Sequence, residues 1–227
     1  MEDQSVTDRP LKHAVILCHP EERSFNGAIA AAYCEAVQKL GHEYILRDLY
    51  RMDFDPVLRG WERATDAQFA LGPDVGRELD LLRGCDVFTL VYPIWFGTPP
   101  AMLKGYVERV LGSGVTPHSV EGRTQTELLG GKRLLSFTTS AMSDPWLNEQ
   151  GQWMSLRYIF DHYLAHAFGM AGDDHVHFAN VRPGMEPRWA QQHLYEVEQR
   201  ARQICATALD DRRKRAGADA APAGATE

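Results

Sequence analysis

Cysteine, long hydrophobic runs and positive charge are all scarce in this sequence, and each shortage excludes a class of protein. The 227 residues include four cysteines that lie far apart and form no C-x-x-C pair, so neither a disulfide framework nor a zinc knuckle is indicated. No apolar run approaches the roughly 20 residues that span a bilayer. Lys and Arg number 24 against 31 Asp and Glu, and the net charge of −7 argues against nucleic-acid binding. We therefore expect a reduced, cytoplasmic protein that neither inserts into a membrane nor binds nucleic acid.

Sequence motifs of several enzyme classes are missing as well. The chain has no G-x-G-x-x-G, no G-x-x-x-x-G-K-[ST] and no G-x-S-x-G, which disfavours a nicotinamide-dinucleotide fold, a P-loop nucleotidase and a serine hydrolase. Two histidine pairs, His162 with His166 and His175 with His177, have spacings that can bind a metal ion. No carboxylate or cysteine pattern completes a zinc site around either pair, so we expect no metal.

The two ends of the chain differ in composition from the rest. Residues 1–10 are polar and form no secretory signal, so we expect a flexible N-terminus. Residues 211–227 combine a short basic run with Ala, Gly and Pro and show no helical or strand period, which predicts a disordered tail. Between them, residues 11–210 have ordinary globular composition and the length of one domain.

Strands and helices alternate along this domain. Short apolar runs predict strands at 13–18, 42–48, 85–92, 132–138 and 175–178. Longer amphipathic stretches predict helices at 26–40, 73–83, 101–111, 152–168 and 186–209, while 49–72 reads as irregular. Such alternation predicts an α/β protein with a parallel sheet covered by helices on both faces. Five strands suit the order 2-1-3-4-5, a flavodoxin-like three-layer sandwich.

In such a sheet the ligand lies beyond the carboxyl ends of the strands, so the loop after the first strand is a candidate site. It reads His19-Pro20-Glu21-Glu22-Arg23-Ser24-Phe25-Asn26-Gly27 and leads directly into a helix. Free N–H groups at a helix start bind phosphate well, and His19, Ser24 and Asn26 could donate to it. The alternative is that Ser24 is an ordinary helix cap.

Two further loops follow the third and fourth strands. Trp95 and Phe96 lie between prolines just after a buried strand, which suggests a wall for a flat apolar ligand, or else a small satellite core. Thr138, Thr139 and Ser140 suit the polar edge of a heterocycle, or else form a plain turn. A phosphate site, an aromatic wall and a hydrogen-bonding edge together describe a flavin site.

These residues resemble the NAD(P)H:quinone oxidoreductases, the flavodoxin-like group that contains DT-diaphorase, bacterial quinone and azo reductases, and the ancillary subunit of glutathione-gated potassium efflux systems. The matching segments appear in the family's order: His19-Pro20 with Ser24-Phe25-Asn26, the stretch 48–56 (DLYRMDFDP), 93–97 (PIWFG), 103–110 (LKGYVERV), and Gly131-Lys132 leading to Thr138-Thr139.

The resemblance implies a set of flavin contacts and a reaction. His19, Ser24, Phe25 and Asn26 would hold the flavin phosphate region, Pro93, Ile94, Trp95 and Phe96 would lie along the isoalloxazine, and Thr138, Thr139 and Ser140 would complete the other side. The flavin, FMN or FAD, would pass hydride from NADH or NADPH to a quinone or similar small electrophilic acceptor. Family members are usually homodimers, so a homodimer is expected.

Two departures from the family's pattern affect the reaction. Ser140 and Ala141 stand where members often have paired glycines, and the loop 143–152 has neither the tyrosine nor the histidine that assists charge relay in better-known quinone reductases. We therefore assign no catalytic acid or base. Two alternatives to the enzyme remain: a regulatory flavoprotein subunit of a membrane transporter, as in potassium efflux, and a single-electron carrier of the flavodoxin kind.

Overall fold

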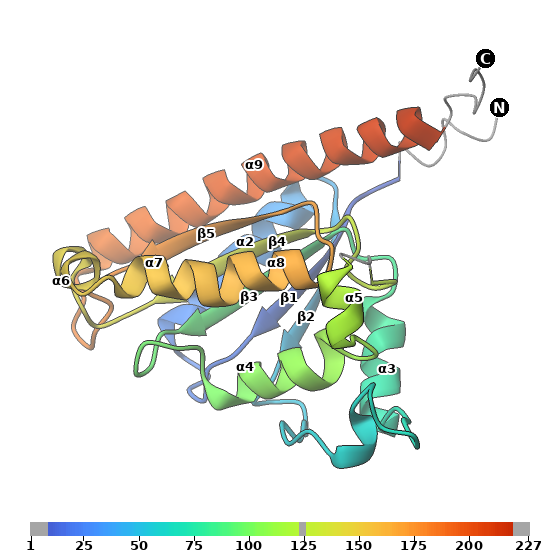
Figure 1. Ribbon diagram of the computed structural model, residues 1–227. Coiled ribbons are helices and arrows are strands. Elements are labelled where there is room, and N and C mark those ends of the chain that lie inside the picture. The colour runs from blue at the N-terminus through green and yellow to red at the C-terminus, as the bar shows by residue number, and fades with distance from the viewer. Residues whose placement is uncertain (1–8, 123–125, 220–227) are drawn as a thin grey trace.

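Five parallel strands form one sheet in the order β2-β1-β3-β4-β5 in the computed structural model, which describes residues 9–122 and 126–219 (Figure 1). The strands are β1 (Lys12–Leu17), β2 (Glu43–Asp48), β3 (Val87–Pro93), β4 (Arg133–Thr139) and β5 (Gly172–Phe178). The order confirms the predicted flavodoxin-like arrangement. Register places Leu17 beside Val91 and Pro93 beside Thr139, so the carboxyl ends of the three central strands meet at one edge.

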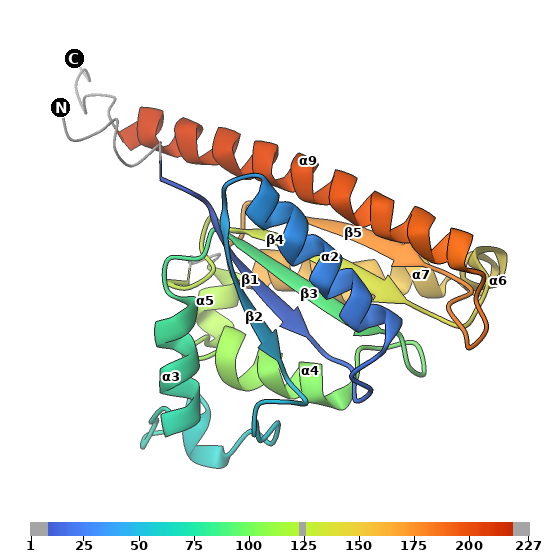
Figure 2. The ribbon, with the colours of Figure 1, turned by 180° about the vertical axis from the view of Figure 1, so that it is seen from behind.

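Helices cover both faces of the sheet, because the strand residues are apolar on both sides. On one face lie α2 (Phe25–Lys39) and the long α9 (Pro187–Asp219), which are in front in Figure 2. The other face carries α3 (Pro73–Leu82), α4 (Ala101–Tyr106), α5 (Pro117–Glu121), α7 (Gln152–Leu156) and α8 (Tyr163–Ala167) (Figure 1). Each face has its own buried apolar cluster, and every residue of β3 is buried between the two.

Two of the predicted helices contain π-helical turns. The stretch 101–111 is α4 followed by the π-helix η2 (Val107–Leu111), and 152–168 is α7, the π-helix η3 (Arg157–His162) and α8. Each π-helix buries one charged side chain, Arg109 in η2 and Asp161 in η3. Such turns are uncommon and occur frequently at functional sites.

The segment 49–72, which we call the strap, was expected to be irregular and contains only a short 3₁₀ turn, η1 (Gly60–Glu62). Arg109 holds it against the body of the protein through Glu62 (Nη2 to Oε1, 2.6 Å), and the same guanidinium pairs with Asp74 of α3 (Nη1 to Oδ2, 2.7 Å). The strap touches α4 at Gly105, where a Cβ atom would lie 2.2 Å from the carbonyl oxygen of Pro56. Only glycine permits this approach.

The prediction of a disordered tail from residue 211 is wrong for residues 211–219, which continue α9. Asp211 accepts from Arg133 Nε at 2.6 Å, and the buried Arg212 donates to Asp86 at 2.8 Å, so side-chain pairing fixes a segment with no apolar period. Arg9 also pairs with Asp86, at 3.0 Å, and is therefore anchored rather than flexible. The remainder of the predicted tail, 220–227, and residues 1–8 lie outside the described residues. Among the helices that are described, none is long and apolar enough to cross a membrane.

Candidate functional site

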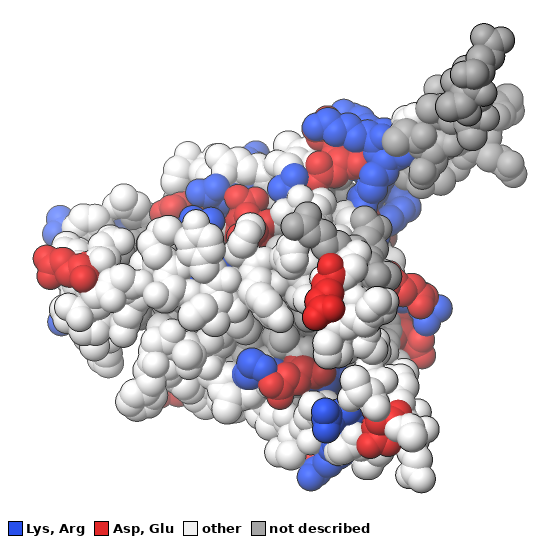
Figure 3. Space-filling view, viewed as in Figure 1, with Lys and Arg blue, Asp and Glu red and all other residues white. Residues whose placement is uncertain are grey.

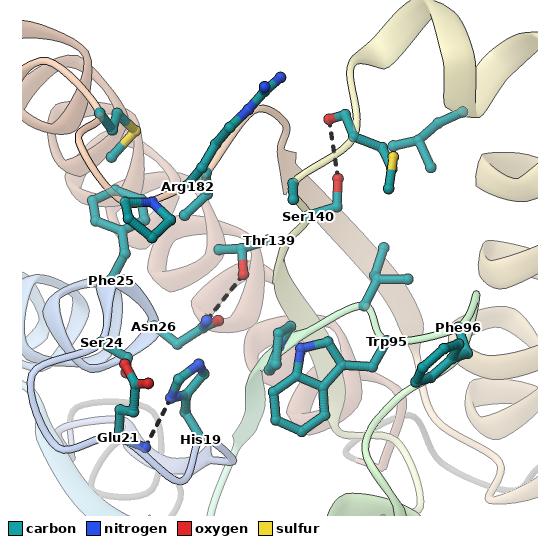
Figure 4. A pocket seen from close by; sticks show the side chains of 18 of the residues that line it. His19, Glu21, Ser24, Phe25, Asn26, Trp95, Phe96, Thr139, Ser140 and Arg182 are labelled. Atoms are coloured by element: carbon teal, nitrogen blue, oxygen red, sulfur yellow. Dashed lines mark hydrogen bonds between the residues drawn. The ribbon is translucent and has the colours of Figure 1, made fainter.

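A cavity of about 920 Å³ opens where β1, β3 and β4 end, at the edge where the sequence places the ligand (Figure 4). This volume lies within the roughly 300–1,000 Å³ that is usual for small-molecule and cofactor sites. Ten of the eleven predicted site residues line it: His19, Ser24, Phe25, Asn26, Pro93, Ile94, Trp95, Phe96, Thr139 and Ser140. Thr138 does not, as described below.

The start of α2 forms one end of the cavity. Ser24 accepts a hydrogen bond from the Gly27 N–H at 3.1 Å and so caps the helix, which was the alternative to a phosphate contact. Its hydroxyl hydrogen remains able to donate to a ligand. The N–H groups of Phe25 and Asn26 have no acceptor within the helix, and the first turn carries no acidic residue. This end therefore attracts an anion.

His19 lies beside this helix start with a defined tautomer. Its Nδ1 accepts a hydrogen bond from the Glu21 N–H at 3.1 Å, so the ring hydrogen is on Nε2, which can donate to a ligand. The His19 ring packs against the Trp95 ring, with centroids 5.8 Å apart and the planes at 59°. The cationic side chains of Arg23 and Arg182 also line the cavity, against one carboxylate, Glu21.

Asn26 joins the first and third loops and leaves one polar atom without a partner. Its Nδ2 donates to Thr139 Oγ1 at 2.9 Å, and Ile94 N donates to the Thr139 carbonyl at 2.8 Å, so the three loops are tied together. The side chain of Asn26 is 2% exposed, and its Oδ1 accepts no hydrogen bond in the part of the chain that the structure describes. A buried unpaired carbonyl oxygen costs about 1–3 kcal/mol, which a ligand hydroxyl or N–H would recover.

The loop after β3 presents its two aromatic rings on a tight turn. Trp95 and Thr98 exchange backbone hydrogen bonds of 3.0 and 3.1 Å, which leaves Phe96 and Gly97 as the two turn residues. Phe96 has φ of 52°, uncommon for a bulky residue, and its side chain is fully exposed. The satellite-core alternative therefore does not apply to Phe96, and a strained turn carries an apolar ring with no packing partner in the described chain.

The third loop divides its hydroxyl residues between the two faces of the sheet. Thr139 and Ser140 line the cavity, whereas Thr138 points to the face opposite Thr139, because successive residues of a strand alternate and Ser140 lies beyond the end of β4. There the Thr138 hydroxyl is buried against His175 and His177. The prediction that all three hydroxyls share one ligand edge overlooked this alternation.

Several lining residues were not among the predicted site residues: Arg23, Met142, Trp146, Gln152, Arg182 and Met185. Arg182 and Met185 follow β5, and the rule that ligands lie beyond the carboxyl ends of strands could have found them had the fifth loop been read as well. Trp146 lies on α6 (Asp144–Glu149), which the sequence pattern did not predict. No group of three or more His, Cys, Asp or Glu side chains in residues 9–122 and 126–219 is arranged to hold a metal ion.

Comparison with known proteins agrees with this fold. A family model described as having a flavodoxin-like fold matches residues 11–203. An uncharacterised NAD(P)H oxidoreductase of Haemophilus influenzae is 33% identical over 169 residues, which cover 74% of this chain and 82% of that protein. The rat NAD(P)H dehydrogenase [quinone] 1 is 32% identical over 143 residues, 55% of this chain but only 52% of the rat protein, so the match spans about half of that relative.

Two solved structures show the same fold at lower sequence identity. The NAD(P)H:quinone oxidoreductase of Methanothermobacter marburgensis has a TM-score of 0.72 at 20% identity, covering 86% of this chain and 96% of that one. An FMN-dependent NADH-azoreductase of Bacillus anthracis, solved in complex with FMN, has a TM-score of 0.63 at 18% identity, and the match covers 86% of this chain and 99% of the azoreductase chain.

Proposed function

This chain belongs to the flavodoxin-like family of NAD(P)H:quinone oxidoreductases, and from that membership we propose that its cavity holds a flavin, FMN or FAD, and that it transfers hydride from NADH or NADPH to a quinone or similar small electrophilic acceptor. The single observation that carries the proposal is the unpaired, buried Oδ1 of Asn26 at the wall of a cofactor-sized cavity. The polyhydroxyl chain of a flavin would supply the donor that this atom lacks.

The α2 end of the cavity fits the flavin phosphate. The donors at this end are His19 Nε2, the Ser24 hydroxyl and the first N–H groups of α2, and Arg23 and Arg182 add positive charge. Binding through backbone N–H groups and hydroxyls does not require a basic protein, which reconciles an anion site with the net charge of −7.

The cavity wall next to this end fits the flavin ring system. Trp95 supplies a flat apolar surface, while the backbone that runs from Pro93 to Gly97 and the hydroxyls of Thr139 and Ser140 supply polar groups for the ring edge. When bound, the flavin supplies the hydride chemistry, accepting from the reduced nicotinamide and donating to the acceptor. The protein's part is to orient the ring against this wall and to exclude water from it.

We also propose that two copies associate through the face formed by α7, η3 and α8. Four apolar or aromatic side chains, Met154, Tyr158, Ile159 and Tyr163, project from it, and Ile159 is 75% exposed. Neutral side chains cover most of this face, with charged groups at its edges (Figure 3). Exposed apolar side chains gathered on one face mark an association site.

The same face continues to the mouth of the cavity. A Cβ atom on Gly97 would lie 3.7 Å from Gln152 Nε2, which places the Phe96 turn beside the start of α7. A second copy seated on this face would therefore cover the exposed Phe96 ring as well. Ile159→Glu should convert the dimer to a monomer in size-exclusion chromatography with light scattering, whereas Leu81→Glu, at an exposed leucine of α3, should not.

Anaerobic reduction followed by reoxidation tests the proposed function. Purified protein loaded with FMN or FAD should bleach on adding NADH or NADPH and recover its absorbance on adding a quinone, and chromatography of the acid-released flavin identifies the natural cofactor. Trp95→Leu should weaken flavin binding, while Trp61→Leu, a tryptophan of similar exposure in η1 (44% against 40%), should not. A loaded protein that turns over slowly with every acceptor and co-purifies with a channel would support the regulatory alternative instead.

A further inference from the structure

Behind the cavity wall, five polar side chains form an unbroken series of hydrogen bonds that ends at Ser140, and we call this series the relay. Asp161 Oδ2 accepts from His175 Nδ1, and His175 Nε2 lies 2.7 Å from Thr138 Oγ1. Thr138 Oγ1 lies 2.8 Å from His177 Nδ1, and His177 Nε2 lies 3.0 Å from Ser140 Oγ. Ser140 lines the cavity, so the relay connects the ligand site to a carboxylate on the opposite side of the sheet.

The inner end of the relay is sealed from solvent. The side chains of Asp161 and His175 are both 0% exposed, and the Trp153 ring lies over both histidines, with centroids 4.6 Å from His175 and 5.2 Å from His177. The π-helix η3 brings Asp161 to this position. A buried histidine–carboxylate pair contributes little net stability compared with apolar packing, so stability alone does not explain it.

The relay has two complete hydrogen-bond arrangements that differ by one proton. With His175 neutral, every hydrogen points inward: Ser140 donates to His177, His177 Nδ1 donates to Thr138, and Thr138 donates to His175. With His175 protonated, every hydrogen points outward, and Ser140 is free to donate to the Met142 carbonyl, 3.3 Å away, or to a ligand. Switching between them moves one proton between His175 and the cavity, with no side chain leaving its place.

The proposed reaction requires such a proton. Reduction of a quinone to a hydroquinone takes two electrons and two protons, and hydride transfer from NAD(P)H supplies both electrons but only one proton. The balanced reaction, quinone plus NAD(P)H plus H⁺ giving hydroquinone plus NAD(P)⁺, takes the second proton from the surroundings. Among the side chains that line the cavity, His19 and Glu21 can gain and lose a proton, and both lie at the α2 end (Figure 4).

We propose that Ser140 delivers this second proton to the acceptor, and that the His175–Asp161 pair is its reservoir, connected through Thr138 and His177. This inference rests on the proposed function. Ser140 is the catalytic residue, because it alone touches the cavity; Thr138, His175, His177 and Asp161 act through it.

The groups around His175 favour this division of roles. Facing it are Asp161 from η3 and His177 from β5, the Tyr92 phenol of β3 lies near Asp161, and α7 contributes only the Trp153 ring. Burial, with a smaller effect of His175, lowers the pKa of His177 to about 4, and burial, with Asp161 next, raises the pKa of Tyr92 well above its usual value. His177 and Tyr92 therefore stay neutral, and His175 is the relay histidine that has a carboxylate as its hydrogen-bond partner.

Thr138→Val tests the relay by removing one hydroxyl from its middle. Loaded Thr138→Val should reduce a quinone about 100-fold or more slower than the wild type, because general acid catalysis typically contributes about 100- to 10,000-fold. Ferricyanide accepts electrons without protons, so its reduction should change less than about threefold. Thr89→Val makes the same substitution at a buried threonine of β3 outside the relay and should affect neither acceptor. If Thr138→Val does not fold, Ser140→Ala, at the cavity rim, should show the same selective loss.

Histidine tautomers in the flavin-free protein give a readout that does not depend on activity. With ¹⁵N-labelled histidine, neutral His175 and His177 should both carry hydrogen on Nδ1, and acid titration of His175 should move the His177 hydrogen to Nε2. In Thr138→Val the two events should be uncoupled. The relay would be overturned if Thr138→Val slowed the reduction of quinone and ferricyanide equally, or did not slow the reduction of quinone. It would also be overturned if the hydrogens of His175 and His177 moved independently in the wild type. A loaded wild type that reduces neither acceptor would refute the proposed function, and with it the need for this proton.

Discussion

Replacing Asn26 with leucine separates the two roles that the structure gives this side chain. Leucine has nearly the same shape but neither the Nδ2 that donates to Thr139 nor the unpaired Oδ1. Losing the hydrogen bond costs about 1 kcal/mol, and removing a buried unpaired acceptor returns about 1–3 kcal/mol. Thr139 lines the cavity, so its hydroxyl can turn to water. The flavin-free variant should therefore be as stable as the wild type or more stable, by up to about 2 kcal/mol.

Binding should change in the opposite direction. If a flavin hydroxyl or N–H donates to Oδ1, the leucine leaves that group unpaired, which costs about 1–3 kcal/mol, or roughly 5- to 150-fold in Kd for FMN. Urea denaturation measures the first effect and fluorescence titration with FMN the second.

Thr139→Val is the matched variant, because it breaks the same hydrogen bond but leaves both polar atoms of Asn26 unpaired. It should destabilise the flavin-free protein by about 1–3 kcal/mol, and the double variant should regain most of that loss. If Asn26→Leu destabilised the protein by more than about 2 kcal/mol and left the Kd for FMN unchanged, the side chain would be structural and this reasoning would be refuted.

Three further predictions concern the fold. Gly105→Ala should destabilise the protein by about 1–3 kcal/mol or more, because its Cβ meets the strap backbone, whereas Gly76→Ala in α3 meets nothing within 4 Å and should stabilise by up to about 1 kcal/mol in urea denaturation. Arg109→Met leaves the buried carboxylate of Glu62 unpaired and should cost about 3–5 kcal/mol in thermal or urea unfolding, with a smaller loss at low pH where Glu62 protonates. Burial lowers the pKa of His13 to about 3 and that of His177 to about 4, so the unfolded chain takes up these protons first as the pH falls below 6.5. Below that pH the free energy of unfolding should fall by about 1.4 kcal/mol per pH unit for each of the two histidines. His177→Gln should reduce the slope of the free energy of unfolding against pH.

The sequence predicted the sheet and most of the cavity wall because both depend on local patterns. Apolar runs such as that of β3 are recognisable on their own, and the carboxyl ends of parallel strands necessarily meet at one edge. Ten of eleven predicted site residues therefore lie together. Thr138 was the last residue of the predicted strand 132–138 and was still grouped with the loop that follows it, whereas strand alternation in β4 turns Thr138 away from Thr139.

What the sequence did not predict depends on contacts between distant residues. The last turns of α9 have no apolar period and are held by Arg212 on Asp86, residues 126 positions apart. The relay likewise joins three elements that only the folded chain brings together: His175 and His177 had appeared as a possible metal pair, and nothing in the spacing indicated that a π-helix would place Asp161 against His175.

Equilibrium binding of FMN and FAD to flavin-free protein tests the central claim most directly. The cavity predicts saturable binding of one flavin per chain, tight with at least one of the two, and weakened by Asn26→Leu and Trp95→Leu but not by Trp61→Leu. If neither flavin bound at high micromolar concentration, the cavity would not be a flavin site. The same would follow if Asn26→Leu and Trp95→Leu bound FMN and FAD as tightly as the wild type and Trp61→Leu.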